Sequence, residues 1–337
     1  TRNKKKMNIC IFGSGAIGSY IGALLMQSRI NVSLICRGEH LNAIQNNGLL
    51  MQSAESGTEY FCKPLATDNP KNLEKQDFII VTLKAHSAAL TANMLSPLLK
   101  ESTTVVSAVN GLPWWYFYKS NNQYENMRLK SVDPKNLQWD CITPERSLGC
   151  VVYPAAEIKA PGHVYHIEGD RFPIGEPDGS ISDRAKILSK ILIQAGLKSP
   201  VRKKIRDDIW MKLWGNLAFN PMSALTGDTL EGIANNEASC AIVKKMMLEG
   251  QKVAEALGVN FPISLEKRID GTRNVGAHKT STLQDLELGR PMEIDALTKS
   301  VSEAGKIVNI PTPTIDKIYE KVKAKAIQAG CYIDPNL

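Results

Sequence analysis

Long apolar runs are missing from this sequence, and none approaches the roughly 18 residues that a membrane span requires. A large excess of one charge is missing too. The net charge is +7, and Arg2, Lys4, Lys5 and Lys6 carry four of those charges, so the rest of the chain carries about +3. That surplus is too small to predict nucleic-acid binding. We therefore expect neither a membrane nor a nucleic acid as a partner.

Features of secreted and metal-binding proteins are also few. The basic start leads into an apolar stretch, but Gly13, Gly15 and Gly18 interrupt it and no cleavage pattern follows, which argues against a signal peptide. The seven cysteines are odd in number and widely spaced, with no CxxC pair, so they indicate neither a disulfide framework nor a zinc site. His163 and His166 would point to opposite faces of a strand. We expect a cytoplasmic protein with no bound metal.

The first part of the chain alternates strand and helix signals. The length of 337 residues suggests two domains, at roughly 150 residues each. Buried-type strands that alternate with helices are typical of a parallel sheet built from βαβ units. The expected strands lie at 7–12, 31–36, 78–83, 103–108, 149–153, 163–166, 171–174 and 197–201, and the expected helices at 16–26, 87–99 and 183–195.

The character of the chain changes near Arg202, beyond which the 3.6-residue spacing of apolar positions predicts helices only. The fold class is therefore α/β, with an N-terminal Rossmann-type parallel-sheet domain at 7–202 and an all-α domain at 203–337. Segment 114–146 is predicted to be an insertion, whose first aromatic residues either form a small core or cover a pocket. The expected C-terminal helices lie at 205–219, 230–257, 264–273, 282–288, 293–308 and 314–329.

The sharpest motif is Gly13-Ser14-Gly15-Ala16-Ile17-Gly18, which follows an expected strand and opens an expected helix. In a dinucleotide site Gly13 allows a tight turn, Gly15 lets the backbone approach a pyrophosphate, and Gly18 lets helix and strand pack closely. The phosphates then lie at the positive end of the helix. A glycine-rich structural turn is the alternative, but the βαβ context favours a dinucleotide site.

The end of the second strand distinguishes the two nicotinamide cofactors. An NAD site carries Asp or Glu near this point, whereas this strand ends in Arg37, whose guanidinium can pair with a 2′-phosphate. We therefore expect NADPH, with a solvated Arg37 beside Glu39 as the alternative. Lys84 and Asn110 also follow strands, at the edge where this fold binds ligands. For Asn110 the alternative is a plain Asn-Gly turn.

A second informative segment carries Lys212, Asn216 and Asn220 at four-residue steps, on one face of an otherwise apolar helix. Polar groups in such surroundings need partners or a cavity. Burial would lower the pKa of Lys212 toward the range in which its ammonium protonates an alkoxide formed by hydride transfer. The alternative is a solvated stripe whose asparagines cap or bridge helices.

A third polar segment has plain structural interpretations. Ser281 is a candidate helix N-cap, with Gln284 completing a capping box. Glu293 is a candidate for the first turn of the following helix, where a carboxylate is favourable.

Together these segments resemble the ketopantoate reductase (2-dehydropantoate 2-reductase) family, over residues 7 to about 330. The resemblance implies an NADPH-dependent enzyme of pantothenate biosynthesis that reduces the 2-oxo acid 2-dehydropantoate to pantoate, as a monomer or homodimer. It is carried by GSGAIG at 13–18, Arg37, VTLKAH at 81–86, VNG at 109–111, WMKLWGNLAFNP at 210–221 and STLQDLELGRPMEID at 281–295, the last being the most specific.

The resemblance also implies roles for single residues. Lys212 matches the general acid that protonates the C2 oxygen, and Glu293 matches an acidic residue near that lysine and the nicotinamide ribose. The implied cofactor contacts are Gly13, Ser14, Gly15, Ala16, Ile17, Gly18, Arg37, Lys84, Asn110, Ala155 and Glu293. The implied substrate contacts are Asn110, Lys212, Asn216, Asn220 and Ser281.

Three features depart from the family's pattern. The stretch at 114–146 is longer than the usual connection, His278 replaces a small or amide residue, and Leu230 stands where some members carry a further asparagine. Two alternatives to the implied function therefore stay open. One is a related reductase of another 2-oxo acid or β-hydroxyacid, and the other is a protein that binds NADPH without catalysis.

Overall fold

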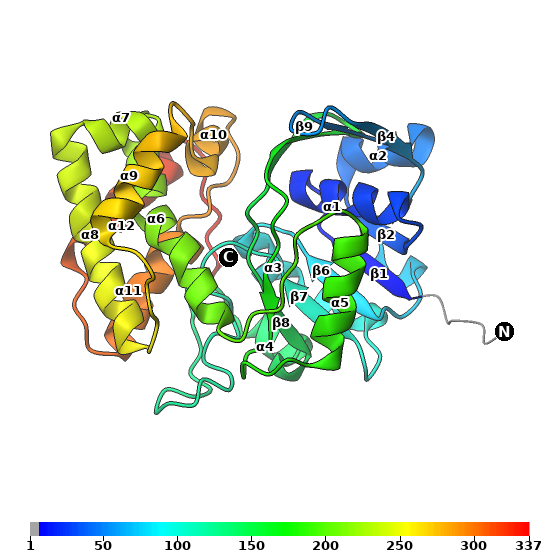
Figure 1. Ribbon diagram of the computed structural model, residues 1–337, viewed down its shortest axis with the longest axis horizontal. Coiled ribbons are helices and arrows are strands. Elements are labelled where there is room, and N and C mark those ends of the chain that lie inside the picture. Colours follow the sequence, from blue (N-terminus) through cyan, green and yellow to red (C-terminus); the bar gives the residue numbers. More distant parts are fainter. Residues whose placement is uncertain (1–6, 337) are drawn as a thin grey trace. The chain divides into compact units, whose positions relative to one another are not determined.

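The computed structural model describes residues 7–336, so the basic residues Arg2 to Lys6 lie outside the described part. The chain forms two compact units (Figure 1). The first contains the chain up to Val109 together with 118–121 and 137–205, and the second contains 110–117, 122–136 and the chain from Arg206 onward. The units thus interleave along the chain before residue 137, and the single boundary at 202/203 stays a prediction. Within residues 7–336 no helix is both long and apolar enough to cross a membrane.

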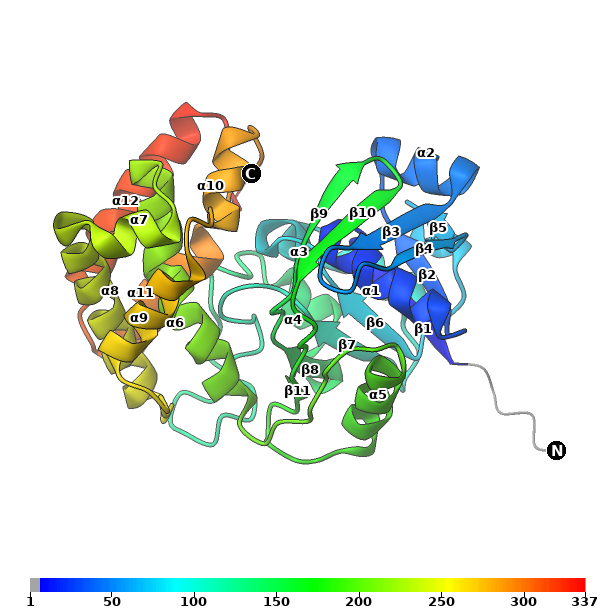
Figure 2. The ribbon, with the colours of Figure 1, turned by 45° about the horizontal axis from the view of Figure 1, so that its top comes forward.

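The first unit is built around a seven-stranded sheet with the order β11-β8-β7-β6-β1-β2-β5 (Figure 2). Neighbouring strands run parallel, except that β11 is antiparallel to β8. The order from β5 to β8 is that of a doubly wound dinucleotide-binding sheet, which confirms the predicted Rossmann-type class. The strands are β1 (Asn8–Phe12), β2 (Asn31–Ile35), β5 (Leu65–Thr67), β6 (Phe78–Val81), β7 (Thr104–Ser107), β8 (Ser147–Cys150) and β11 (Ile174–Gly175).

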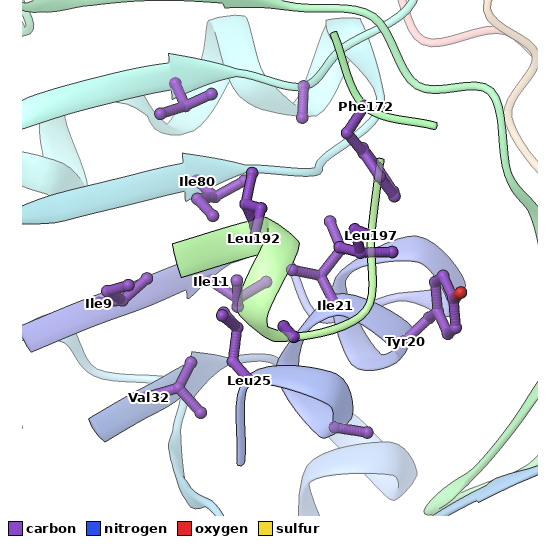
Figure 3. Packing of buried hydrophobic residues seen from close by; sticks show 14 of the residues in the cluster. Ile9, Ile11, Tyr20, Ile21, Leu25, Val32, Ile80, Phe172, Leu192 and Leu197 are labelled. Carbon is purple, nitrogen blue, oxygen red and sulfur yellow. The ribbon is translucent and has the colours of Figure 1, made fainter. Parts of the chain in front are cut away.

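The sheet is stable because apolar side chains cover both of its faces. On β1, Ile9 and Ile11 join a core cluster with Ile21 and Leu25 of α1 (Ala16–Gln27) and Leu192 of α5 (Asp183–Gln194). Figure 3 shows these side chains gathered between the two helices and the strands. Burial of each such side chain is worth roughly 1.5–3 kcal/mol. The continuous apolar runs that predicted these strands are therefore the part of the sequence that builds this core.

A second, four-stranded sheet lies over α1, with the order β4-β3-β10-β9 (Figure 2). Tyr20 of α1 stacks on His166 of this sheet with ring centroids 4.2 Å apart. We predicted only its strand near 163–166, because the other strands are short, partly exposed and have no continuous apolar run. Its strands are β3 (Leu49–Ser53), β4 (Glu59–Cys62), β9 (Ala155–Ala160) and β10 (His163–Glu168).

The remaining helices of the first unit connect the strands of the two sheets. The predicted strand at 197–201 is wrong, since residues 198 and 201 form only isolated bridges. The predicted helix at 87–99 starts earlier and tightens into a 3₁₀ helix, which also contains Pro97. The remaining elements are α2 (Gly38–Asn47), which we did not predict, η1 (Pro70–Asn72), α3 (Ala85–Thr91), η2 (Ala92–Leu98), α4 (Leu137–Cys141) and η3 (Pro144–Arg146).

The second unit is helical, as predicted, and no strand is present in its described residues. The helix expected over 230–257 is divided at Asn236, whose backbone is extended and whose side chain accepts a hydrogen bond from the Ser239 amide. The helix expected from 293 begins instead with a π-helical turn at 295. The elements are α6 (Ile205–Thr226), α7 (Leu230–Asn235), α8 (Glu237–Ala256), α9 (Leu265–Val275), α10 (Ser281–Glu287), η4 (Asp295–Lys299), α11 (Ser300–Ile307) and α12 (Pro313–Gln328).

The aromatic start of the predicted insertion forms a small core within the helical unit. Trp115, Tyr116 and Phe117 are almost fully buried. Trp210 of α6 donates a 2.8 Å hydrogen bond to the Tyr116 hydroxyl, and Arg206 donates a 2.9 Å bond to the Tyr116 carbonyl. Of the two interpretations of these aromatic residues, the structure therefore supports the small core, and this core adjoins the first turns of α6.

Replacement of Tyr116 by phenylalanine tests this anchor. Tyr116→Phe leaves the buried Trp210 N–H without its phenolic acceptor, so we expect a loss of about 1–3 kcal/mol in the free energy of unfolding. Urea unfolding measures the loss. The matched control is Tyr124→Phe, whose hydroxyl bonds the exposed Gln123 side chain, and we expect a change below about 0.5 kcal/mol. Equal stability of the two variants would contradict the anchoring role.

Candidate active site

The carboxyl ends of β1 and β6 mark the switch point of the first sheet, because connections leave these neighbours in opposite directions. Gly13 follows β1 with φ +104°, and a Cβ atom there would lie 2.6 Å from the Leu83 side chain. A Cβ atom on Gly18 would lie 2.5 Å from the Gly13 carbonyl oxygen and 2.6 Å from Oγ1 of Thr82. A Cβ atom on Gly15 would meet nothing within 4 Å. Two glycines of the motif therefore serve close packing, and the third borders open space.

The helix that follows the motif presents its first turn without a side-chain cap. Gly15 is the N-cap residue of α1, and the N-terminal turn contains no acidic residue. Ser19 has its amide bonded to the Gly15 carbonyl, 2.8 Å away, so the helical pattern begins directly at the glycine. Uncapped amides at the positive end of a helix form an anion site of the kind that holds a pyrophosphate. The motif thus has the local geometry that the sequence predicted.

A histidine that the sequence did not single out supports this loop. His40 in the first turn of α2 has Nδ1 3.0 Å from the Gly162 amide and Nε2 3.0 Å from the Ser19 hydroxyl. Because Nδ1 accepts the amide hydrogen, Nε2 carries the ring proton and donates to Ser19. Ser19 in turn lies 2.9 Å from the Ser14 hydroxyl of the motif. Burial lowers the pKa of His40, which favours this neutral form. This hydrogen-bond network could not be predicted from the sequence, because its members come from distant parts of the chain.

Three further predicted cofactor residues lie at strand ends of the first unit. Arg37 is exposed and occupies the N-cap position of α2, after β2. Lys84 is half-buried and occupies the N-cap position of α3, after β6. Burial lowers the pKa of the neighbouring His86 to about 4, and the charge of Lys84 adds to this effect. Ala155 is the first residue of β9 in the second sheet. The strands before Arg37 and Lys84 are the two neighbours of β1.

Three predicted catalytic and binding residues meet in the second unit. The Lys212 ammonium of α6 donates a 2.8 Å hydrogen bond to Oδ1 of Asn110. The Asn110 amide nitrogen donates in turn to Glu293 Oε2 at 3.4 Å. Gly111 follows with φ +88°, and a Cβ atom there would lie 2.2 Å from the Ala296 carbonyl oxygen. The chain bends at the Asn-Gly pair, and Asn110 has a specific place beside the lysine, so the pair is more than a plain turn.

This arrangement suits proton donation. An ammonium is a donor only, and the amide oxygen of Asn110 orients it without accepting its charge. A carboxylate on the other side of the amide completes a chain from ammonium to Glu293. A positioned ammonium can protonate an oxygen that becomes an alkoxide during reduction. Among residues 7–336 there is no cluster of three or more His, Cys, Asp or Glu side chains that could hold a metal ion.

The predicted substrate residues are placed less uniformly. Asn216 lies one turn after Lys212 on α6 and is half-buried. Asn220 is buried, and its amide nitrogen donates a 3.0 Å hydrogen bond to Oγ1 of Thr282. Asn220 therefore bridges α6 and α10, as the alternative interpretation of the stripe held. Ser281 is exposed at the first position of α10. Of these three residues, Asn220 is thus the one whose side chain joins two helices.

The capping interpretation of the third segment is wrong. The N-cap of α10 is Thr280, whose hydroxyl accepts a 3.1 Å hydrogen bond from the Leu283 amide. Gln284 donates to the Lys279 carbonyl and so completes no capping box. Glu293 does not begin a helix either, because it precedes the π-helical turn by two residues. Local signals could not separate Thr280 from Ser281, since both residue types cap helices well.

Leu230 and His278, the two positions at which the resemblance predicts a departure from the family pattern, lie together. The Leu230 amide donates a 2.9 Å hydrogen bond to the His278 carbonyl. Leu230 opens α7, and His278 precedes α10 by three residues. The sequence alone did not predict this contact, because the two residues are far apart along the chain. The two positions are therefore joined by the backbone, in the segment that leads to Ser281.

The glycines of the motif can be separated experimentally. Gly18→Ala places a methyl group against backbone and strand, so we expect it to destabilise the fold by about 1–3 kcal/mol. Gly15→Ala meets open space, so its free energy of unfolding should change by less than about 0.5 kcal/mol, while the dinucleotide affinity falls. Urea unfolding and fluorescence titration with NADPH measure both effects. Unchanged affinity in Gly15→Ala would argue against a phosphate at this loop.

Known proteins confirm the family resemblance. Residues 9–179 match the model of the family "Ketopantoate reductase PanE/ApbA", and residues 204–326 match "Ketopantoate reductase PanE/ApbA C terminal". A protein of Mesorhizobium japonicum named 2-dehydropantoate 2-reductase is 49% identical over 97% of this chain and 100% of its own length. A protein of the same name from Pyrococcus horikoshii is 29% identical over 96% of this chain and 99% of its own length.

Solved structures show the same fold. A structure from Ralstonia solanacearum, assigned as a ketopantoate reductase, has a TM-score of 0.91 and 37% identity, over 97% of this chain and 99% of that chain. A D-mandelate dehydrogenase in complex with NADH and anilino(oxo)acetate has a TM-score of 0.81 over 96% of this chain and 99% of that chain. Its 23% identity shows a shared fold. With both halves matched by the family's models and relatives aligned over nearly its whole length, the chain belongs to the ketopantoate reductase family, a family of oxidoreductase enzymes.

Proposed function

We propose that this chain reduces 2-dehydropantoate to pantoate with NADPH. The observation that carries the proposal is the hydrogen bond from the Lys212 ammonium to Asn110, which is itself bonded to Glu293. Three residues from distant parts of the chain meet there, and the family resemblance implies a role in the reaction for each. The name of the Mesorhizobium japonicum relative, at 49% identity, supports the same substrate.

The proposed chemistry divides the reduction between hydride and proton. When bound, NADPH supplies a hydride to the C2 carbon of the oxo acid and leaves as NADP⁺. Lys212 donates its proton to the C2 oxygen as negative charge develops there, which yields the hydroxyl group, and the neutral amine then regains a proton from water. Asn110 holds the ammonium in place through its amide oxygen. Glu293 accepts a hydrogen bond from the Asn110 amide nitrogen and so orients the amide oxygen toward the lysine.

The first unit would hold the cofactor. The loop from Gly13 to Gly18 and the uncapped first turn of α1 suit the pyrophosphate. Arg37 and Lys84, at the ends of β2 and β6, would provide positive charge for the 2′-phosphate, which distinguishes NADPH from NADH. Ala155 would contribute a backbone contact. The choice of NADPH over NADH rests on these two side chains.

The substrate would be held by polar groups of the helical unit. Asn216 lies one turn from Lys212 on α6, where its amide can bond a carboxylate or hydroxyl of the oxo acid. Ser281 and Asn220 belong to α10 and α6, which the bond from Asn220 to Thr282 joins.

We also propose a cytoplasmic enzyme that is a monomer or homodimer.

A second candidate function is the reduction of another 2-oxo acid. The joined departures at Leu230 and His278 favour it, because they alter the segment that leads to Ser281. An apolar Leu230 in place of an asparagine offers one hydrogen-bonding side chain fewer to a hydroxylated substrate. The third possibility, a protein that binds NADPH without catalysis, is disfavoured by the intact Lys212–Asn110–Glu293 arrangement.

The deciding experiment follows NADPH oxidation at 340 nm. The purified protein is given 2-dehydropantoate or one of several other 2-oxo acids, with NADH in parallel. We expect kcat/KM for 2-dehydropantoate to reach about 10⁴ M⁻¹s⁻¹ or more, which is within the normal range of enzymes. Faster turnover of another oxo acid would select the second candidate. Binding of NADPH without turnover of any of them would select the third.

Lys212→Ala tests the proton donor. Loss of a positioned general acid typically costs about 10²–10⁴-fold in rate, so we expect kcat to fall by that amount while NADPH affinity survives. The matched control is Lys252→Ala on α8, where the lysine is exposed. Near-normal turnover of Lys212→Ala would refute the assignment.

Arg37→Ala tests the cofactor preference. Without the guanidinium we expect KM for NADPH to rise about tenfold or more, since a charge-assisted bond to a phosphate contributes about 1.5–3 kcal/mol. KM for NADH should hardly change. Lys63→Ala removes an exposed charge between β4 and β5. It controls for the effect of losing one positive charge on the electrostatic attraction of the cofactor. Equal rises for both cofactors would show that Arg37 does not contact a 2′-phosphate.

A further inference from the structure

The turn after Glu293 is unusual in its geometry. Residues Asp295–Lys299 form a π-helical turn, η4, which continues directly into α11. Such turns are rare, are less favourable than regular α-helix, and occur often at functional sites. The Gly111 backbone packs against this turn, because a Cβ atom on Gly111 would lie 2.2 Å from the Ala296 carbonyl oxygen. The turn is therefore one wall of the place that Asn110 occupies.

The carboxylate of Asp295 anchors the turn on its other side. Tyr319 of α12 donates a 2.5 Å hydrogen bond to Oδ1, and Tyr332, beyond α12, donates a 2.9 Å bond to Oδ2. Burial raises the pKa of Asp295, while the two phenol bonds oppose that rise. Burial and the carboxylate both raise the pKa values of the two tyrosines, so they stay protonated donors. Both oxygens of this carboxylate are thus committed to hydrogen bonds.

The ammonium groups of two lysines lie over the rings of these two tyrosines. The Lys323 ammonium lies 5.8 Å from the Tyr319 ring centre and 5.2 Å from that of Tyr332. Lys299, the last residue of the π turn, lies 4.9 Å above the Tyr319 ring. A cation over a phenol ring is attracted to its π face and makes the hydroxyl a better donor. The cluster therefore combines charge, hydrogen bonds and apolar packing.

The chain from Met292 to Ile294 restricts the position of Glu293. Met292 and Ile294 are each about 2% exposed and pack with Tyr319 in one core cluster, whereas Glu293 is half-buried. The Met292 amide also donates a 2.9 Å hydrogen bond to the Cys331 carbonyl. Burial of Met292 and Ile294 fixes the chain on both sides of Glu293, whose Oε2 accepts the 3.4 Å hydrogen bond from the Asn110 amide.

We infer that Asp295, held by Tyr319 and Tyr332, is a positioning residue for the reduction: it fixes the π turn against which Asn110 and Glu293 are set, and thereby orients the Lys212 ammonium. The inference rests on the proposed function for the meaning of that orientation. The inference assigns a role in the site to Tyr332, although this residue lies 120 positions after Lys212 in the sequence. Asp295 touches neither substrate nor cofactor in this role.

The test compares Tyr332→Phe, Tyr319→Phe, Asp295→Asn and Asp295→Ala with Tyr124→Phe, a tyrosine variant of the same unit outside the cluster. Turnover of 2-dehydropantoate and the Kd for NADPH are measured in parallel. We expect kcat to fall about tenfold or more in Tyr332→Phe, because a small misplacement of a catalytic group is costly, while the Kd for NADPH is unchanged. Asp295→Asn retains an acceptor and should lose less than Asp295→Ala.

A second readout is independent of turnover. Acetic anhydride acetylates lysine amines at rates set by their protonation and surroundings, and mass spectrometry quantifies the label on Lys212. We expect the labelling rate of Lys212 to change in Tyr332→Phe and Asp295→Asn, but not in Tyr124→Phe. If kcat and Lys212 labelling match the control while only the thermal midpoint falls, the cluster is merely structural and the inference is overturned.

The two readouts separate the inference from the proposed function. If the wild-type protein does not oxidise NADPH with 2-dehydropantoate, the proposed function fails, and the labelling of Lys212 alone supports or overturns the positioning role. Asp295→Ala risks loss of folding, since it leaves the buried Tyr319 and the half-buried Tyr332 without their acceptor. Tyr332→Phe keeps the carboxylate and its bond to Tyr319, so it yields folded protein for both measurements.

Discussion

The hydrogen bond between Lys212 and Asn110 is the interaction on which the proposed chemistry depends. A lysine on a helix lined by tryptophans would be costly to hold in place without a partner, because burial penalises an ammonium. Asn110 supplies that partner, 2.8 Å away, and passes the contact on to Glu293. The chain bends at Gly111, which has a positive φ and where no side chain fits beside Ala296. The close approach of the backbone at this one glycine thus sets the position of Asn110 beside Lys212.

The dinucleotide loop depends on a comparable exclusion of side chains. Gly13 and Gly18 lie where a methyl group would collide with the neighbouring strand or loop, which brings α1 close to β1 and β6. The second sheet covers α1 from the other side, and His40 joins its Gly162 turn to Ser19 below the motif. The loop is therefore supported by packing on both sides of α1. Gly15 is the glycine of the motif that borders open space.

Prediction from the sequence succeeded where the signal was local and strong. Strands such as β1 and β6 are continuous apolar runs, because both faces of the sheet are buried, and the helices after Arg206 show their spacing clearly. It failed for β4 and β9, whose residues are mostly half-exposed. It also failed for the cap of α10, since Thr280 and Ser281 have nearly equal capping propensity and tertiary contacts selected the first.

The sequence by itself determined the fold class, the family and the residue types of the candidate site, because glycine spacing, strand hydrophobicity and the lysine–asparagine helix are local properties. Only the tertiary structure decided which of those residues meet. It joined Lys212 to Asn110 across 102 positions of sequence, set Asn220 on Thr282, and brought Tyr332 to Asp295. Such pairings depend on how buried surfaces fit together, and the free energy of that fit is shared among distant residues that no local pattern connects.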